Sequence, residues 1–126
     1  KAYDQTLKAG DGEFVGFAGV NLALVQFHNG LPLKLVEESI RDLTKRMRAL
    51  KQENSVFFAV PYWQMVLNFM GRSDHAVVLN GRAMNEEEFL HQTREAKHEV
   101  GVVSCRLVSL ILSVHFGALV QVEEVL

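Results

Sequence analysis

Cysteine and proline are scarce in this 126-residue chain, and no low-complexity stretch interrupts it. The single cysteine, Cys105, excludes an internal disulfide framework and fits a reducing compartment, so we expect a cytoplasmic protein. The formal charge of −2 gives no overall attraction to nucleic acid or to an anionic membrane. With two prolines and 48% hydrophobic residues, the chain has the size and composition of one domain with a sizeable core.

Motifs of the common catalytic sites are also missing. The chain has no phosphate-binding loop of the Gly-x-x-x-x-Gly-Lys type, no dinucleotide-binding glycine motif and no nucleophile elbow. Its basic residues are not joined to an aromatic platform, as they are in many nucleic-acid-binding modules. We therefore expect no catalytic, cofactor-binding or metal-binding residues, and no enzyme activity in this chain.

One phrase occurs three times: an apolar run that ends in phenylalanine and glycine. The copies end at Phe27-His28-Asn29-Gly30, Phe69-Met70-Gly71 and Phe116-Gly117. Their glycines are separated by 41 and 46 positions. Such periods are typical of helical solenoids, in which each unit stacks on the next.

The first unit, residues 11–52, is predicted to be a helix pair. Asp11 is expected to cap an apolar helix at 13–28, buried on most of its surface, which Asn29 and Gly30 end. A second helix is expected over about 33–52. Its apolar residues step by four and three along one stripe, opposite a charged face. The stripe residues are Val36, Ile40, Leu43, Met47 and Leu50.

The second unit, residues 54–98, is less regular. An apolar helix over 56–70 contains Pro61, which predicts either a kink or a helix that begins at the proline. Ser73 is then expected to cap a short helix at 74–79, and no alternation predicts a strand. Asn85, followed three residues later by an acid, predicts the start of a polar helix that reaches about His98.

The third unit, residues 99–126, is predicted to be a helix to Phe116, a break at Gly117 and a resumed helix. The chain starts at Lys1 and ends inside this last helix, so we expect a fragment of a longer protein. The predicted fold is a single all-α domain. Antiparallel helix pairs would stack on one another as an irregular α-solenoid.

A metal site is the main alternative reading of the polar helix. Glu88-x-x-His91 and Glu95-x-x-His98 both match the Glu-x-x-His motif of di-iron bundles. There the motifs come from different helices, whereas here both are expected on one helix, so a solvated face is favoured. The alternative that stays open is a bundle that binds a metal or small molecule through His91, Glu95 and His98.

Other unusual residues have structural explanations. The basic residues between Arg41 and Lys51 fit the outer face of a packed helix better than a calmodulin-target or membrane-surface helix. Cys105 is expected to be a buried small hydrophobe. Trp63 is expected to anchor the second unit. Residues 100–122 are long and apolar enough to span a membrane, but Arg106 and several polar residues favour a buried helix.

Several stretches resemble a known family region. They are Gly10-Asp11-Gly12-Glu13-Phe14, Leu35-Val36-Glu37, the segment 64–71, and Leu79-Asn80-Gly81 with Met84-Asn85-Glu86-Glu87-Glu88. The region is the tetratricopeptide-like helical segment of large multi-domain signalling proteins. These also carry a serine/threonine-kinase-like domain, a P-loop ATPase domain and a sensor histidine kinase or cyclase. The period here exceeds the 34 residues of standard tetratricopeptide repeats.

The resemblance implies that kinase, ATPase or cyclase activity belongs to other domains of the parent protein. Together with the repeat pattern, it predicts a tetratricopeptide-like superhelix. Its expected role is a non-catalytic helical-repeat scaffold for protein–protein interaction or interdomain relay. The expected partners are a protein or flanking domains of the same chain, with neither nucleic acid nor a membrane involved.

Overall fold

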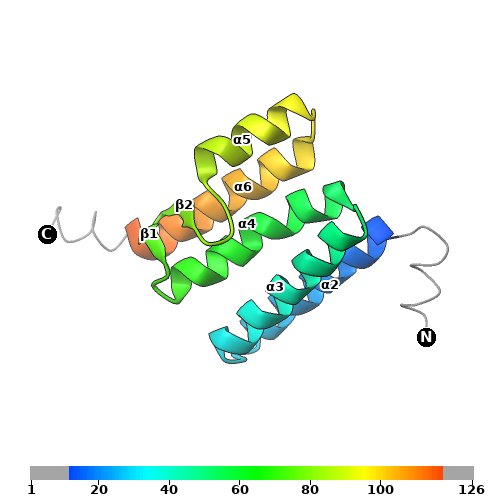
Figure 1. The fold of residues 1–126 in the computed structure, drawn as a ribbon. Helices are drawn as coiled ribbons and strands as arrows, with labels where there is room; N and C mark the ends of the chain where they lie inside the picture. The colour runs from blue at the N-terminus through cyan, green and yellow to red at the C-terminus, as the bar shows by residue number, and fades with distance from the viewer. Residues whose placement is uncertain (1–11, 118–126) are drawn as a thin grey trace, which may run out of the picture.

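The computed structural model describes residues 12–117, with side chains from residue 16, and within them the fold is mostly helical (Figure 1). Five α-helices occur in this part of the chain, and α6 continues into a π-helical turn, Ser113–Gly117. The helices are α2 (Gly12–His28), α3 (Leu33–Ala49), α4 (Glu53–Phe69), α5 (Glu86–Glu95) and α6 (Glu99–Leu112). The all-α prediction is confirmed at this level. The cap by Asp11 and the helix after Gly117 lie outside the described residues.

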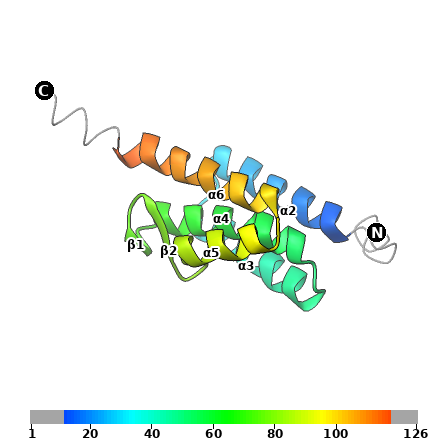
Figure 2. The same cartoon turned by 90° about the horizontal axis from the view of Figure 1, so that it is seen from above.

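Helix α4 is the centre of the fold, because its whole middle section is buried. Figure 2 shows α2 and α6 on one side of α4, and α3 and α5 on the other. Helix α4 packs on α2, α3 and α6, whereas α5 packs mainly on α6. Every residue from Ser55 to Asn68 is buried or half-buried. A helix buried in this way is expected to be mostly apolar all round, as α4 is apart from buried polar residues such as Gln64 and Asn68.

Helices α2 and α3 form the antiparallel pair that the sequence predicts. Gly30 ends the first helix with a φ of 82°, the left-handed conformation that glycine adopts without strain. Val36, Ile40 and Met47 of the α3 stripe are completely buried. Close approach of α2 to α4 needs Gly16, where an added Cβ would lie 2.5 Å from the Cβ of Ser55.

Helix α4 begins at Glu53 and runs through Pro61, so a helix start at the proline is wrong. Gly71, at φ 76°, ends the segment as predicted. Trp63 anchors α4 to α3, since its indole Nε1 donates a hydrogen bond of 2.8 Å to the buried carboxylate of Glu37. Arg41 also pairs with Glu37, so the buried carboxylate has two partners.

The predicted short helix at 74–79 is wrong, because a β-hairpin occupies this segment. Strands β1 (Ser73–His75) and β2 (Val78–Gly81) pair antiparallel, with Ser73 opposite Gly81 and His75 opposite Val78. The Ser73 hydroxyl donates to the His75 carbonyl instead of capping a helix. The expectation that no strand forms is therefore wrong here. The cause is that α4 donates side-chain hydrogen bonds to the hairpin.

Helix α5 begins as predicted, but ends earlier. The Asn85 side chain accepts a hydrogen bond of 3.0 Å from the Glu88 N–H and caps the helix. The helix ends at Glu95, and Lys97 turns the chain with a φ of 55°. The Nδ1 of His98 then accepts a 2.8 Å hydrogen bond from the Gly101 N–H, so His98 caps α6.

Candidate functional site

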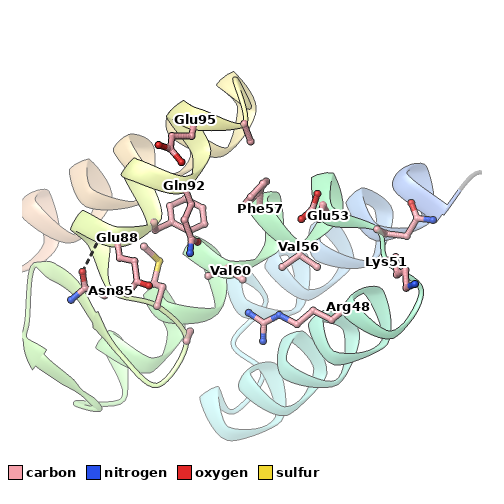
Figure 3. Close-up of a pocket in the computed structure, with 15 residues that line it drawn as sticks. Arg48, Lys51, Glu53, Val56, Phe57, Val60, Asn85, Glu88, Gln92 and Glu95 are labelled. Carbon is pink, nitrogen blue, oxygen red and sulfur yellow. Dashed lines mark hydrogen bonds between the residues drawn. The ribbon is translucent and has the colours of Figure 1, made fainter.

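A groove lies between α3 and α5, over the amino-terminal half of α4 (Figure 3). Its volume is about 1080 Å³. The amino-terminal half of α4 forms the floor, through Val56, Phe57 and Val60. Ala83 and Met84, in the connection that leads into α5, also line it. The floor is therefore apolar.

The two walls of this groove carry opposite charges. Arg48, in the last turn of α3, and Lys51, just after α3, lie on one wall. Glu88 and Glu95 lie on the other, and Figure 3 shows Gln92 between them on α5. Glu53, at the start of α4, also lines the groove. All these charged side chains are exposed at the rim. The groove thus combines an apolar base with a basic and an acidic edge.

Two buried amides of α4 hold the hairpin beside the groove. The Asn68 side-chain nitrogen donates to the carbonyls of Ala76 and Val78, at 3.1 and 3.0 Å. Gln64 donates to the Asn68 oxygen at 2.8 Å, and its own oxygen accepts from the Ala83 N–H at 3.0 Å. Buried amides need such partners. A hairpin that offers its carbonyls satisfies them, which explains why a helix does not form here.

The hairpin also determines where α5 lies. The Asn80 side chain accepts a hydrogen bond of 2.8 Å from the Glu86 N–H, at the start of α5. The Glu86 carboxylate accepts from the Leu79 N–H and from the Ser109 hydroxyl of α6. Because these contacts direct α5 toward α6, the space between α5 and α3 stays open as the groove.

A second surface feature is a stripe of exposed apolar side chains on α6 and the π-helical turn. We call it the α6 apolar face; its members are Val100, Val103, Leu107, Leu110, Ile111 and Val114. Val103, Leu110 and Val114 are each at least 60% exposed. On α2, Leu22 and Val25 are also exposed. The predictions that α2 and the third-unit helix would be mostly buried are therefore wrong, because neighbouring helices cover one face of each.

The segment Glu99–Phe116 is long and apolar enough to cross a membrane, judged by length and composition alone. Its opposite face is packed inside the domain, where Cys105, Val108 and Leu112 are completely buried. A helix surrounded by lipid would have to give up these contacts with α4 and α5. In this fold the segment is a helix that packs into the bundle on one side and is uncovered on the other.

The structure brings together two of the three residues of the alternative metal site and separates the third, His98, from them. His91 pairs with Glu95 across one turn of α5, at 3.3 Å. His98 lies on the next element, where its Nδ1 caps α6 and its ring packs 5.1 Å from that of Phe57. Among residues 12–117, no three His, Cys, Asp or Glu side chains are grouped closely enough to hold a metal.

The structure also shows the surroundings of the cysteine and of the basic residues that the sequence singled out. Cys105 is a buried free thiol, as predicted. Burial and, to a smaller extent, the Glu86 carboxylate raise its pKa to about 11, although Arg106 and Arg94 act in the opposite direction. Burial also raises the pKa of Tyr62. Of the basic residues of α3, Arg41 pairs with Glu37, while Arg48 lines the groove.

The sequence analysis missed the groove and the roles of Gln64 and Asn68. A signal was present, because two amides spaced by four residues inside an apolar helix require buried partners. The partners themselves could not be read from the spacing. No protein-family model, curated protein or solved structure matches this chain.

Proposed function

We propose that this chain is a non-catalytic helical-repeat scaffold for protein–protein interaction, and that the α6 apolar face is its docking surface. The observation that carries the proposal is the exposure of this face. Contiguous apolar patches on soluble domains mark interaction sites far more often than isolated exposed side chains do. The face is one regular stripe, with Val100, Val103, Leu107, Leu110 and Val114 spaced by three and four residues.

The order of the helices supports the repeat architecture. Helices α2, α4 and α6 run in one direction, and α3 and α5 run in the other (Figure 1). Stacked helix pairs have this alternation, and each unit contacts its neighbours. The β-hairpin between α4 and α5 makes the second unit irregular. In this arrangement the face on α6 is where a further helical surface would continue the stack.

The charges on α6 favour a protein partner over a lipid surface. Helices that lie on membranes carry several lysines or arginines along their polar side. Glu99 and Arg106 are the charged residues of α6. We therefore assign the face to an apolar helical surface of a protein, in a flanking domain or a separate chain of the cytoplasm. In a signalling protein, such docking would relay a change in one domain to the next.

Cysteine accessibility tests this proposal. Single cysteines at Val103 and Leu110 would be labelled with a maleimide in the purified chain and in the cell of origin. We expect slow labelling in the cell and fast labelling in the purified chain, because the partner covers the face. Glu87→Cys is the matched control, since position 87 is exposed on α5 and should be labelled equally in both settings.

Two outcomes would overturn the proposal. Equal labelling at positions 103 and 110 in both settings would mean that nothing covers the face. Protection that disappears when membranes are dissolved by mild detergent would assign the face to lipid instead of protein. The native Cys105 interferes little, because its thiol is buried and protonated at neutral pH.

A further inference from the structure

The groove between α3 and α5 is a second binding surface, separate from the α6 apolar face. We propose that it binds an amphipathic helix of a partner protein whose apolar stripe has carboxylates along one flank and basic side chains along the other. The inference goes beyond the proposed function, since it concerns other residues and other chemistry. It rests on the size, the floor and the charges of the groove.

The size of the groove suits a helix. Its volume of about 1080 Å³ lies above the roughly 300–1000 Å³ of most small-molecule pockets. Helices α3 and α5 lie on the same side of α4, with the groove between them (Figure 2). Helices pack with their axes about 8–10 Å apart. A helix laid on α4 between α3 and α5 would complete this side of the domain.

The floor offers an apolar surface to a bound helix. Val56, Phe57 and Val60 follow one another on α4 at helical spacing, and the first two are only half-buried. The ring of Phe57 lies 5.9 Å from that of Phe89 on α5, which extends the apolar surface across the base. An amphipathic helix recognised in this way contributes apolar residues at i, i+3, i+4 and i+7.

The charges of the walls determine the flanks of the partner. Glu88, Gln92 and Glu95 are spaced by four and three residues, so they form a polar row about 10 Å long at 1.5 Å per residue. Arg48 and Lys51 face them from the α3 side. Within residues 12–117, neither Arg48, Lys51 nor Glu88 is in an ion pair. These charges are free to pair with a bound helix.

Partners of uniform charge fit this groove poorly. A helix with carboxylates on both flanks would meet repulsion from Glu88 and Glu95, and an entirely basic helix would meet it from Arg48 and Lys51. Nucleic acid is disfavoured in the same way, because its phosphates would lie against the acidic wall. A helix with carboxylates on one flank and basic side chains on the other can form ion pairs with both walls at once.

Three synthetic helical peptides of about three turns test the proposal. All share one leucine and alanine stripe, and the flanks are Glu on one side and Lys on the other, Glu on both, or Lys on both. Binding to the full 126-residue chain is measured by fluorescence anisotropy of a labelled peptide. We expect the mixed peptide to bind most tightly, with an affinity that falls as salt is added.

Charge reversals should change the preference in opposite directions. Arg48→Glu together with Lys51→Glu makes both walls acidic, so the all-Lys peptide should become the preferred probe. Glu88→Lys together with Glu95→Lys should favour the all-Glu peptide. We expect roughly threefold to tenfold changes in affinity for each reversal, as exposed ion pairs allow.

Matched controls separate the groove from overall charge. Glu87→Lys makes the same change beside Glu88, and Lys45→Glu makes the Arg48 change one turn away; both positions lie outside the groove. Circular dichroism confirms that each variant is folded. The proposal is overturned if no peptide binds, if the three bind equally, or if the controls change affinity as much as the groove variants. The α6 apolar face is intact in all of them, so either proposal can fail alone.

Discussion

The rings of Phe27 and Phe69 lie 5.4 Å apart, although their positions in the chain are 42 residues from each other. The ring of Phe69 also contacts that of Phe116, with the two ring centroids 5.6 Å apart. These are the three phenylalanines that precede the unit-ending glycines. They meet because α2, α4 and the α6 segment end at the same side of the domain, so the repeated phrase corresponds to one aromatic cluster.

The Phe27–Phe69 contact is expected to be measurable by a double-mutant cycle. Phe27→Leu and Phe69→Leu should each destabilise the fold, and the pair should couple by about 0.5–1.5 kcal/mol, because aromatic rings gain energy beyond their buried area. Urea unfolding gives the free energies. The control cycle pairs Phe69→Leu with Phe57→Leu, because the ring of Phe57 contacts those of Phe89 and His98. Additive effects in both cycles would contradict the expectation.

Asn68→Leu should release the hairpin. The change removes the two hydrogen bonds to the carbonyls of Ala76 and Val78 and the one accepted from Gln64, for an expected loss of about 2–3 kcal/mol. Hydrogen exchange should become faster in the hairpin and at the start of α5, while α2 and α3 change less. Asn21→Leu, at an exposed position of α2, is the control and should be nearly neutral. Unchanged exchange in the hairpin would show that Asn68 does not anchor it.

Gly71→Ala should destabilise through the backbone alone. Gly71 has a φ of 76°, and an added Cβ would meet no atom within 4 Å, so no clash contributes. The left-handed conformation costs a non-glycine residue about 1–2 kcal/mol. Gly71→Asn should lose less, since asparagine tolerates this region better. Thermal or urea unfolding checks the order, and equal losses for Ala and Asn would contradict it.

Cys105 should make stability depend on alkaline pH. The thiol has a pKa of about 11 in the fold, against an ordinary value of 9.0. Between these values the unfolded chain releases the proton while the folded chain keeps it. The free energy of unfolding is therefore fully retained below pH 9 and falls as the pH rises toward 11. Cys105→Ala should have a flatter profile over this window, even though Tyr62 also contributes on the alkaline side. Identical profiles would contradict the assignment.

Most helices could be predicted because their signals are local. The spacing of Val36, Ile40 and Met47 defines a stripe, Gly30 and Gly71 mark helix ends, and Asn85 marks a helix start. The boundary near His98 was misplaced for a physical reason. A histidine that caps the next helix has the same spacing to Glu95 as one within the same helix, and sequence spacing alone does not distinguish them.

The hairpin and the groove could not be predicted in the same way. Residues 73–81 have little local preference, and their conformation depends on hydrogen bonds to Gln64 and Asn68. Arg48 and Glu88 are 40 positions apart and come to opposite walls only because the hairpin directs α5 toward α6. Both features arise from contacts between residues distant in the chain.

The sequence by itself determined the helical class, the glycine stops and the apolar periodicity, because these follow from backbone conformation and from burial of one stripe. Only the tertiary structure decided which apolar residues are covered. Helix α6 has two apolar sides, and its sequence does not distinguish Val108, which is buried against the domain, from Leu110, which is exposed. The difference comes from the position of α4. The packing of the other helices around α4 leaves the α6 apolar face and the groove uncovered, and the two proposals rest on these surfaces.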